Sequence, residues 1–293
     1  MKKETVLAVD VGGTKVLIGE VDKEGNVLSQ NKFKSDISSQ KVALNQIIDA
    51  IIDYFSKEVI GDIKAIAVDI VGRVNSDKGI WYEIDPTEKN EINVSKELEK
   101  RFNLPCFVIN DLAAATEAEN LLGIGNVTKN FVYLSIGTGI AGRMVVDSES
   151  RVKCICGRYG CVEPLASGLG MSNQAHELKK FNDTQLEVLP NHRVGAKELF
   201  EAYDQNDPLA LAVVNQSLEA TSNMVMNLVR IINPKAVRFG GGVTTGGWYV
   251  DHLQKLLDLQ TMRFVKYGVK NTELDPNLIA LQGCALFAFS RIV

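Results

Sequence analysis

Three apolar segments of this chain each end in glycine, and this pattern limits the fold more than any other feature of the sequence. The segments are VLAVDVGGT (6–14), FVYLSIGTG (131–139) and VRFGGGV (237–243). Each has the residue types of a buried strand followed by a turn. The first two lie about half the chain apart, so we interpret them as copies of one α/β unit. Chance recurrence of a strand–glycine turn is the alternative.

The segments around these strands alternate between strand and helix patterns. KVLIGEVD (15–22) and NVLSQNKF (26–33) predict two more strands, split by a turn at 23–26. Strands are also expected at 64–72 and 106–111, and helices at 44–55, 95–102, 112–122, 208–233 and 278–289. This order predicts two similar α/β lobes around a cleft. We expect one lobe at 1–115, with the helix at 278–293 packing near it, and a second at 116–277.

Charge and cysteine usage exclude several classes of protein. The net charge is -4 and the sequence pI is about 5.6, which argues against a nucleic-acid surface. No apolar window approaches the roughly 18 residues of a membrane span, and the apolar stretch at the start is too short for a secretory signal. Three of the five cysteines lie within eight positions, at 154, 156 and 161. Such clustering favours a metal site over disulfides and therefore a reducing, cytoplasmic setting.

Two carboxylates follow strands at places where ligands bind in open α/β sheets. Glycine turns can offer backbone N–H groups to phosphate, so Asp10, just before Gly12 and Gly13, predicts a Mg²⁺ ion between carboxylate and phosphate. The alternative is that Asp10 caps N–H groups of the hairpin. Asp111 stands at a helix start, where the helix favours its ionised form, and could accept a proton from a hydroxyl. The alternative is an ordinary N-cap. No GxGxxG motif opens a helix, so a dinucleotide site is not expected.

The motifs together resemble those of the ROK family. They are DVGGTK (10–15), IND (109–111), SIGTGIAG (135–142), CICGRYGCVE (154–163) and FGGGV (239–243), in the family's order over almost the whole chain. The resemblance implies an actin-like, hexokinase-type α/β fold, in which a ribonuclease H-like unit is duplicated. It also implies an ATP-dependent kinase acting on a hydroxyl of a hexose or hexosamine.

The resemblance assigns roles to single residues. It implies that Asp111 is the catalytic base. The implied sugar-binding residues are Asn110, Asp111, Glu163 and Gly72. The implied ATP- and phosphate-binding residues are Asp10, Gly12, Gly13, Thr14, Lys15, Gly137, Thr138, Gly139, Gly240, Gly241 and Gly242. ATP and Mg²⁺ would be the cofactors. A sugar and ATP would be the partners, with no nucleic acid or membrane, and the assembly would be a homodimer.

One segment departs from the family pattern. Cys154, Cys156 and Cys161 would give three thiolates to a structural zinc, which needs a fourth ligand. In the family that ligand is a histidine of a Gly-Glu-x-Gly-His segment, but this chain has Arg143 there, and arginine cannot bind zinc. The histidines lie elsewhere, at 176, 192 and 252. The sequence alone therefore favours a metal-free cluster and an incomplete sugar site. Asp85 also replaces a frequent asparagine.

These departures leave two alternatives to a sugar kinase. A sugar or nucleotide sensor without efficient catalysis is favoured by the missing glutamate and histidine, whereas the presence of Asp111 favours the enzyme. A ROK-type transcriptional regulator is disfavoured because only nine residues precede Asp10, too few for a DNA-binding domain.

The stretch between Ile140 and Cys154 is too short for a complete second lobe. The first lobe continues past its glycine turn with two strands, but only 13 residues separate Ile140 from Cys154, with one plausible strand at 144–146. We therefore expect that residues are absent here, either from the gene or from the sequence as given. The loss could follow a second strand at 143–146 or precede Gly142; the spacing to Cys154 favours the second. A second lobe without this strand pair would expose a sheet edge.

Overall fold

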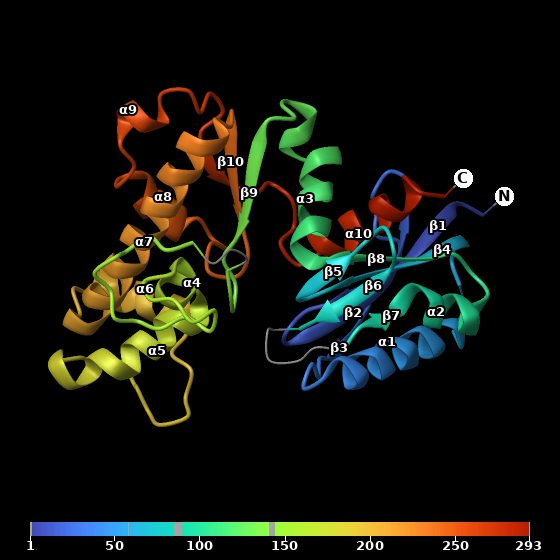
Figure 1. The fold of residues 1–293 in the computed structure, drawn as a ribbon, viewed down its shortest axis with the longest axis horizontal. Coiled ribbons are helices and arrows are strands. Elements are labelled where there is room, and N and C mark those ends of the chain that lie inside the picture. Colours follow the sequence, from blue (N-terminus) through green and yellow to red (C-terminus); the bar gives the residue numbers. More distant parts are fainter. Residues whose placement is uncertain (1, 58, 85–89, 141–143, 293) are drawn as a thin grey trace. The chain divides into compact units, whose positions relative to one another are not determined.

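The computed structural model describes residues 2–57, 59–84, 90–140 and 144–292, which form two compact units. Unit 1 comprises Met1–Asn126 and Asn277–Val293, and unit 2 comprises Val127–Pro276 (Figure 1). Unit 1 extends past the expected boundary at 115 because helix α3 (Asp111–Leu121) packs on the C-terminal helix α10 (Ile279–Phe289).

Unit 1 is built on a five-stranded mixed sheet in the order β3-β2-β1-β4-β8. Its strands are β1 (Glu4–Val11), β2 (Lys15–Asp22), β3 (Asn31–Lys34), β4 (Asp62–Ile70) and β8 (Cys106–Asn110). β1, β2 and β3 form an antiparallel meander, whereas β1, β4 and β8 are parallel. The third meander strand starts later than the expected residue 26, although Val27 still forms a bridge with Val21.

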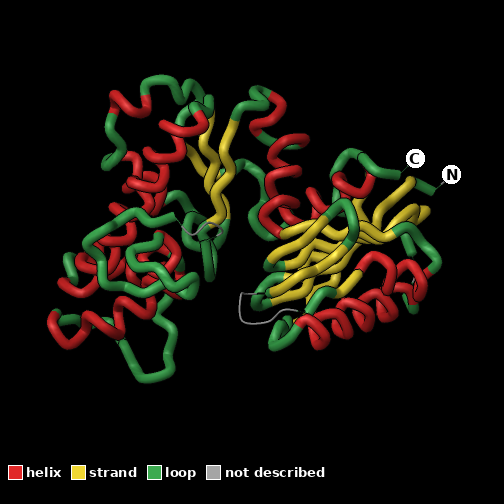
Figure 2. The backbone as a smooth tube through the Cα atoms, in the orientation of Figure 1, coloured by secondary structure: helices red, strands yellow, loops and turns green. Residues whose placement is uncertain are grey.

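Helices cover both faces of this sheet, as the alternation of side chains along β1 requires. Leu7, Val9 and Val11 face the core beneath α1 (Gln40–Phe55) and α2 (Val94–Phe102). The residues between them, Val6 and Ala8, pack with α10 on the opposite face. Figure 2 shows the yellow strands of this sheet between the two sets of red helices.

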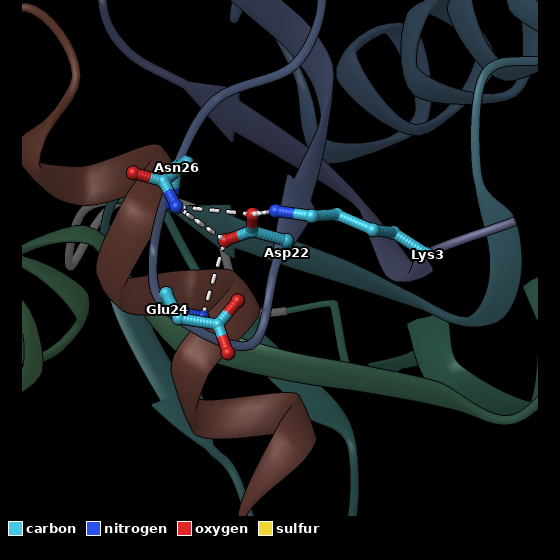
Figure 3. Close-up of polar contacts among 4 residues, drawn as sticks. All are labelled: Lys3, Asp22, Glu24 and Asn26. Atoms are coloured by element: carbon cyan, nitrogen blue, oxygen red, sulfur yellow. Dashed lines mark hydrogen bonds and ion pairs between the residues drawn. The ribbon is translucent and has the colours of Figure 1, made fainter.

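The turn between β2 and β3 follows the signal seen in the sequence at 23–26. The Asp22 carboxylate accepts hydrogen bonds from the backbone N–H groups of Glu24 and Asn26 and from the Asn26 side chain. Lys3 closes the arrangement with an ion pair of 2.9 Å to Asp22 (Figure 3). Because these bonds satisfy the turn's exposed N–H groups, they set where β2 ends.

A smaller antiparallel sheet lies beyond the end of β4. It consists of β5 (Arg73–Asn75), β6 (Ile80–Glu83) and β7 (Ile92–Asn93). Trp81 on β6 is fully buried, and its indole N–H donates to the carbonyl of Val71. This contact ties the small sheet to the end of β4. Asp85 lies outside the described residues.

Unit 2 contains a parallel three-stranded sheet in the order β11-β10-β9. Its strands are β9 (Phe131–Ser135), β10 (Ala236–Gly240) and β11 (Val269–Asn271). The helices are α4 (Val162–Ala166), α5 (Gly168–Leu178), α6 (Ala196–Asp204), α7 (Pro208–Ile232), α8 (Trp248–Gln254) and α9 (Leu259–Met262), with short 3₁₀ turns at Ile124–Asn126 in unit 1 and Lys179–Phe181 in unit 2. The helix predicted from 208 is α7; Asp207 caps it and Asn233 ends it in a left-handed conformation.

Unit 2 repeats only the parallel part of the unit 1 sheet. β9, β10 and β11 have the mutual order of β1, β4 and β8, but the described residues of unit 2 hold no counterpart of β2 and β3. After β9 the chain makes a single bridge between Ile136 and Ile140, and Val145 then pairs with Cys161. β9 is therefore an edge strand of this sheet among the described residues. Residues 141–143, including Arg143, lie outside the description.

None of the described helices has the length and apolar character needed to cross a membrane. The longest, α7, carries polar residues along one side and packs the other into the core of unit 2.

A substitution at Gly283 of α10 would test the close packing of α10 on α3. A Cβ atom at this position would collide with the backbone of Ala114 and Ala118. At an open helical position, Gly→Ala stabilises by about 1 kcal/mol. Here we expect Gly283→Ala to lower the free energy of unfolding by about 1–3 kcal/mol, because overpacking forces the helices apart. Urea unfolding measures this change, and an unchanged or raised midpoint would contradict the packing.

Candidate functional site

Parallel pairing brings two aspartates side by side at the carboxyl end of the unit 1 sheet. Asp10 on β1 is in register with Asp69 on β4, and Ile70 is in register with Asn110 on β8. Both aspartates fall in the set of positions that faces α10, next to Cys284. Sequence analysis missed Asp69. The available signal was an acidic residue inside the otherwise apolar run AIAVDIV.

Asp69 is a fully buried carboxyl group without an ordinary hydrogen-bond donor among the described residues. Glu20 is equally buried, but its carboxylate has hydrogen-bond donors around it. Its carboxylate accepts from the Thr5 and Tyr54 hydroxyls and from the backbone N–H groups of Ile60 and Gly61. A buried acid without such donors costs free energy, so Asp69 is not explained by stability alone.

Burial and mutual repulsion control the protonation of this pair. The pKa of Asp69 is raised well above its ordinary value, first by burial and then by the charges of Asp10 and Asp111. Burial also raises the pKa of Asp10, against the lowering effects of contact with Asp69 and of the Lys15 ammonium. Asp10 does not cap the N–H group of Gly12 in the hairpin. That N–H donates instead to the carbonyl of Lys15. The capping alternative for Asp10 is therefore not supported.

Asp111 is the first residue of α3, and its pKa is raised to about 6. The main cause is burial, and the charge of Asp10 adds to it, while hydrogen bonds from the Leu112 N–H and the Asn110 side chain act in the opposite direction. The expected stabilisation of its charge by the helix is outweighed by burial. Asp111 remains mostly ionised at pH 7, so it can act as a base there. The N-cap alternative is wrong, because Asn110 is the cap.

Asn110 and Gly72 hold Asp111 in place. The Asn110 amide oxygen accepts from the N–H groups of Leu112 and Ala113, and its nitrogen donates to Gly72 O and to Asp111 Oδ1. These four bonds use the whole bonding capacity of the amide. Gly72 has φ of 92°, and a side chain there would collide with the backbone of Glu83. The sugar-binding roles of Asn110 and Gly72 stay predictions, and in this structure both residues position Asp111.

The first glycine turn of unit 1 leaves space for a ligand. The nearest atom to a Cβ at Gly12 would be 3.5 Å away, and at Gly13 3.9 Å away. Glycine at these two positions is therefore not needed for packing. Lys15 Nζ lies 3.4 Å from the carbonyl oxygen of Asn277, which places its charge at the same turn. Thr14 O accepts from Ser35 N–H and ties the turn to the segment after β3.

The two glycine segments of unit 2 are hydrogen-bonded into one site. Ile136 N–H donates to Gly240 O at 2.9 Å, and Val243 N–H donates back to Ile136 O at 3.0 Å. On the other side, Gly168 and Leu169 at the start of α5 donate to the carbonyls of Gly137 and Thr138. No atom lies within 4 Å of a Cβ built at Gly137 or Gly242. Open backbone at the ends of β9 and β10 is what a phosphate site requires.

The three clustered cysteines converge on one point. Their sulfurs lie within 4.8 Å of one another, and Cys156 Sγ and Cys161 Sγ are 3.7 Å apart. Ligands in a tetrahedral zinc site, at about 2.3 Å from the metal, have nearly this spacing. Contact with Arg158 lowers the pKa of Cys156 to about 6, which favours the thiolate that binds metal. Gly157, with φ of 89°, forms the turn between the cysteines. No fourth ligand joins them among the described residues.

The cysteine cluster also positions Glu163. Cys161 is the residue before α4, and Glu163 lies in the first turn of that helix. Glu163 Oε1 would be 3.1 Å from a Cβ at Gly139, so the carboxylate stands beside the second glycine turn. The structure thus brings Glu163 together with Gly137–Gly139 in unit 2, and Asp10 together with Asp111 in unit 1.

The raised pKa of Asp111 can be measured directly. In a carboxyl ¹³C titration, Asp111 should show a midpoint of about 6, identified by loss of its signal in Asp111→Asn. Asp10→Asn should lower this midpoint because it removes a neighbouring negative charge. A midpoint near the ordinary aspartate value of about 4, unaffected by Asp10→Asn, would contradict the buried arrangement.

The spacing of the three sulfurs predicts a bound zinc, whereas the missing fourth ligand predicts a metal-free cluster. We follow the geometry and expect one zinc per chain, by elemental analysis, in protein purified without chelator. Cys156→Ser should lose the zinc, whereas Cys106→Ser, a buried cysteine outside the cluster, should keep it. Wild-type protein without zinc would instead support the metal-free cluster.

Comparison with known proteins agrees with these motifs. The sequence model of the ROK family matches residues 6–151 and 141–275. The chain is 26% identical over 267 residues to a glucokinase of Streptomyces coelicolor, covering 82% of this chain and 83% of that protein. It is 25% identical over 308 residues to an N-acetylmannosamine kinase of Haemophilus influenzae, covering 92% and 96%.

Two features of these alignments bear on the expected short segment between Ile140 and Cys154. The two family matches overlap at 141–151, so the match does not run through this region continuously. The alignment with the N-acetylmannosamine kinase is longer than the 293 residues of this chain, so that relative carries residues without a counterpart here.

The fold also has solved counterparts. A ROK family glucokinase from Streptomyces griseus, solved with glucose and AMPPNP, superposes with a TM-score of 0.75 at 23% identity, covering 98% of this chain and 99% of that one. The predicted fold class, an actin-like α/β fold of two units, is thereby confirmed. Because the family match spans nearly the whole sequence, the chain belongs to the ROK family.

Proposed function

We propose that this protein is an ATP-dependent sugar kinase that phosphorylates a hydroxyl of a hexose or hexosamine. The observation that carries the proposal is Asp111, a partly buried carboxyl group with a pKa raised to about 6, at the end of a strand and the start of a helix. The kinases similar to this chain include a glucokinase and an N-acetylmannosamine kinase, which supports both an unmodified hexose and an N-acetylated hexosamine as candidates.

Asp111 would accept the proton of the attacking sugar hydroxyl. At pH 7 its carboxylate is mostly ionised, yet it is basic enough to take a proton as the hydroxyl oxygen bonds to phosphorus. Asn110 and Leu112 N–H fix the carboxylate through Oδ1. The other oxygen of the carboxylate, Oδ2, would accept the proton of the hydroxyl. Positioning of this kind carries most of the catalysis in phosphoryl transfer.

Asp10 suits the Mg²⁺ ion that an ATP-dependent kinase uses. Its carboxylate lies beside the buried oxygens of Asp69, which lack donors, and beside the open turn at Gly12 and Gly13. Hard oxygen ligands of this type fit Mg²⁺, which would neutralise charge on the nucleotide phosphates. In the same reaction the open turns of unit 2, at Gly137–Gly139 and Gly240–Gly242, would bind ATP. The homodimer expected from the family stays a prediction.

A non-catalytic sensor is the second candidate, favoured by the absent glutamate and histidine segment before Cys154. Both candidates bind ligand, and only the kinase turns over. A coupled assay of ATP consumption over glucose, fructose, mannose, their N-acetyl amines and β-glucosides separates them.

In that assay, Asp111→Asn should lower kcat on the best sugar by about 100- to 10,000-fold, because the base is lost. ATP affinity should stay within about twofold. Asp183→Asn, an exposed aspartate of unit 2, is the matched control and should keep wild-type kcat. Wild-type kcat in Asp111→Asn would show that another group is the base. ATP binding without turnover on any sugar would favour the sensor.

A further inference from the structure

Arg193 is a cation beside the second glycine turn, and nothing in the sequence pattern pointed to it. Its Nη1 donates to the Thr138 hydroxyl at 3.5 Å, and its Nη2 would be 3.0 Å from a Cβ at Gly168. The carbonyl oxygen of Gly137 lies 3.1 Å from that same point. Two separate distances therefore place the guanidinium beside the turn that follows β9, where this turn is hydrogen-bonded to the start of α5.

The backbone around Arg193 is fixed by α5 on both sides. The residue before it, His192, accepts a hydrogen bond of 2.8 Å from the His176 ring on α5. The residue after it, Val194, is buried and donates to the Ser172 hydroxyl at 3.1 Å. Because α5 also holds Gly137 and Thr138 through its first N–H groups, one helix fixes the positions of both the turn and the arginine.

The charge of Arg193 is available to a ligand. The side chain is exposed, and the ion pairs found among the described residues do not include it. Of its five N–H donors, the bond to Thr138 uses one. Open space lies next to it at Gly137 and Gly242. An unpaired guanidinium above open backbone matches the needs of a phosphate group, which accepts paired hydrogen bonds from arginine.

We propose that Arg193 binds the phosphate chain of the nucleotide at the Gly137–Gly139 turn. It would donate to phosphate oxygens and add a positive charge that the glycine N–H groups cannot supply. This inference rests on the proposed ATP-dependent function and adds to it a specific residue that recognises the phosphates rather than the nucleoside.

Calorimetric titration of the full-length protein with ATP, ADP and adenosine tests this role without any sugar. Arg193→Ala should weaken binding of ATP and ADP by about 10- to 100-fold, the usual effect of losing a charge-assisted pair. Adenosine binding should change less than twofold. The ATP affinity of Arg193→Lys should lie between those of the wild type and Arg193→Ala, because lysine keeps the charge but loses the paired geometry.

Arg230 provides the matched control. It is also exposed and also donates to a threonine hydroxyl, that of Thr261 at 3.1 Å, so Arg230→Ala removes the same charge and the same type of bond. It should leave ATP binding unchanged. Wild-type ATP affinity in Arg193→Ala, or an equal loss for adenosine, would overturn the inference. A wild-type protein that binds no ATP at all would instead overturn the proposed kinase.

Discussion

The parallel pairing of β1, β4 and β8 is the constraint on which the unit 1 site depends. Parallel strands end at one edge of a sheet, and the register sets Asp10 directly beside Asp69. β8 ends at Asn110, so the chain enters α3 with Asp111 close enough to feel the charge of Asp10. Packing of α10 over this edge removes water, and burial then raises the pKa of all three carboxyl groups. The same geometry that folds the sheet thus raises the pKa of Asp111 to about 6, close to neutral pH.

Much of the fold could be predicted from the sequence because apolar periodicity and turn residues are local signals. The run VLAVDV predicted β1, and Asp207 with Pro208 predicted the start of α7. Features that depend on contacts distant in sequence could not be predicted. The run AIAVDIV marks Asp69 as an acid within a buried strand, but its place beside Asp10 follows only from the pairing of β4 with β1. Arg193 likewise reaches its turn only through α5. The helix rule alone suggested an ordinary ionised Asp111, and burial by distant segments outweighed it.

The sheet of unit 2 is smaller than that of unit 1 among the described residues. It keeps the three parallel strands that carry the glycine turns, and the described residues lack the two meander strands. The chain between β9 and the cysteines instead pairs with the cluster itself, through Val145 and Cys161. The cluster begins α4 and so places Glu163, even though the family's histidine is replaced by arginine in this chain.

We propose that Asp111, a partly buried carboxyl group with a raised pKa, acts as the base of a sugar kinase. The pH dependence of kcat/KM for the best sugar, at saturating Mg²⁺ and ATP, tests it most directly, because this ratio reports ionisations of the enzyme before the sugar binds. Asp111 must be ionised to act, so kcat/KM should fall tenfold per pH unit below a midpoint of about 6. A profile that stays flat from pH 5 to 8 would contradict the account.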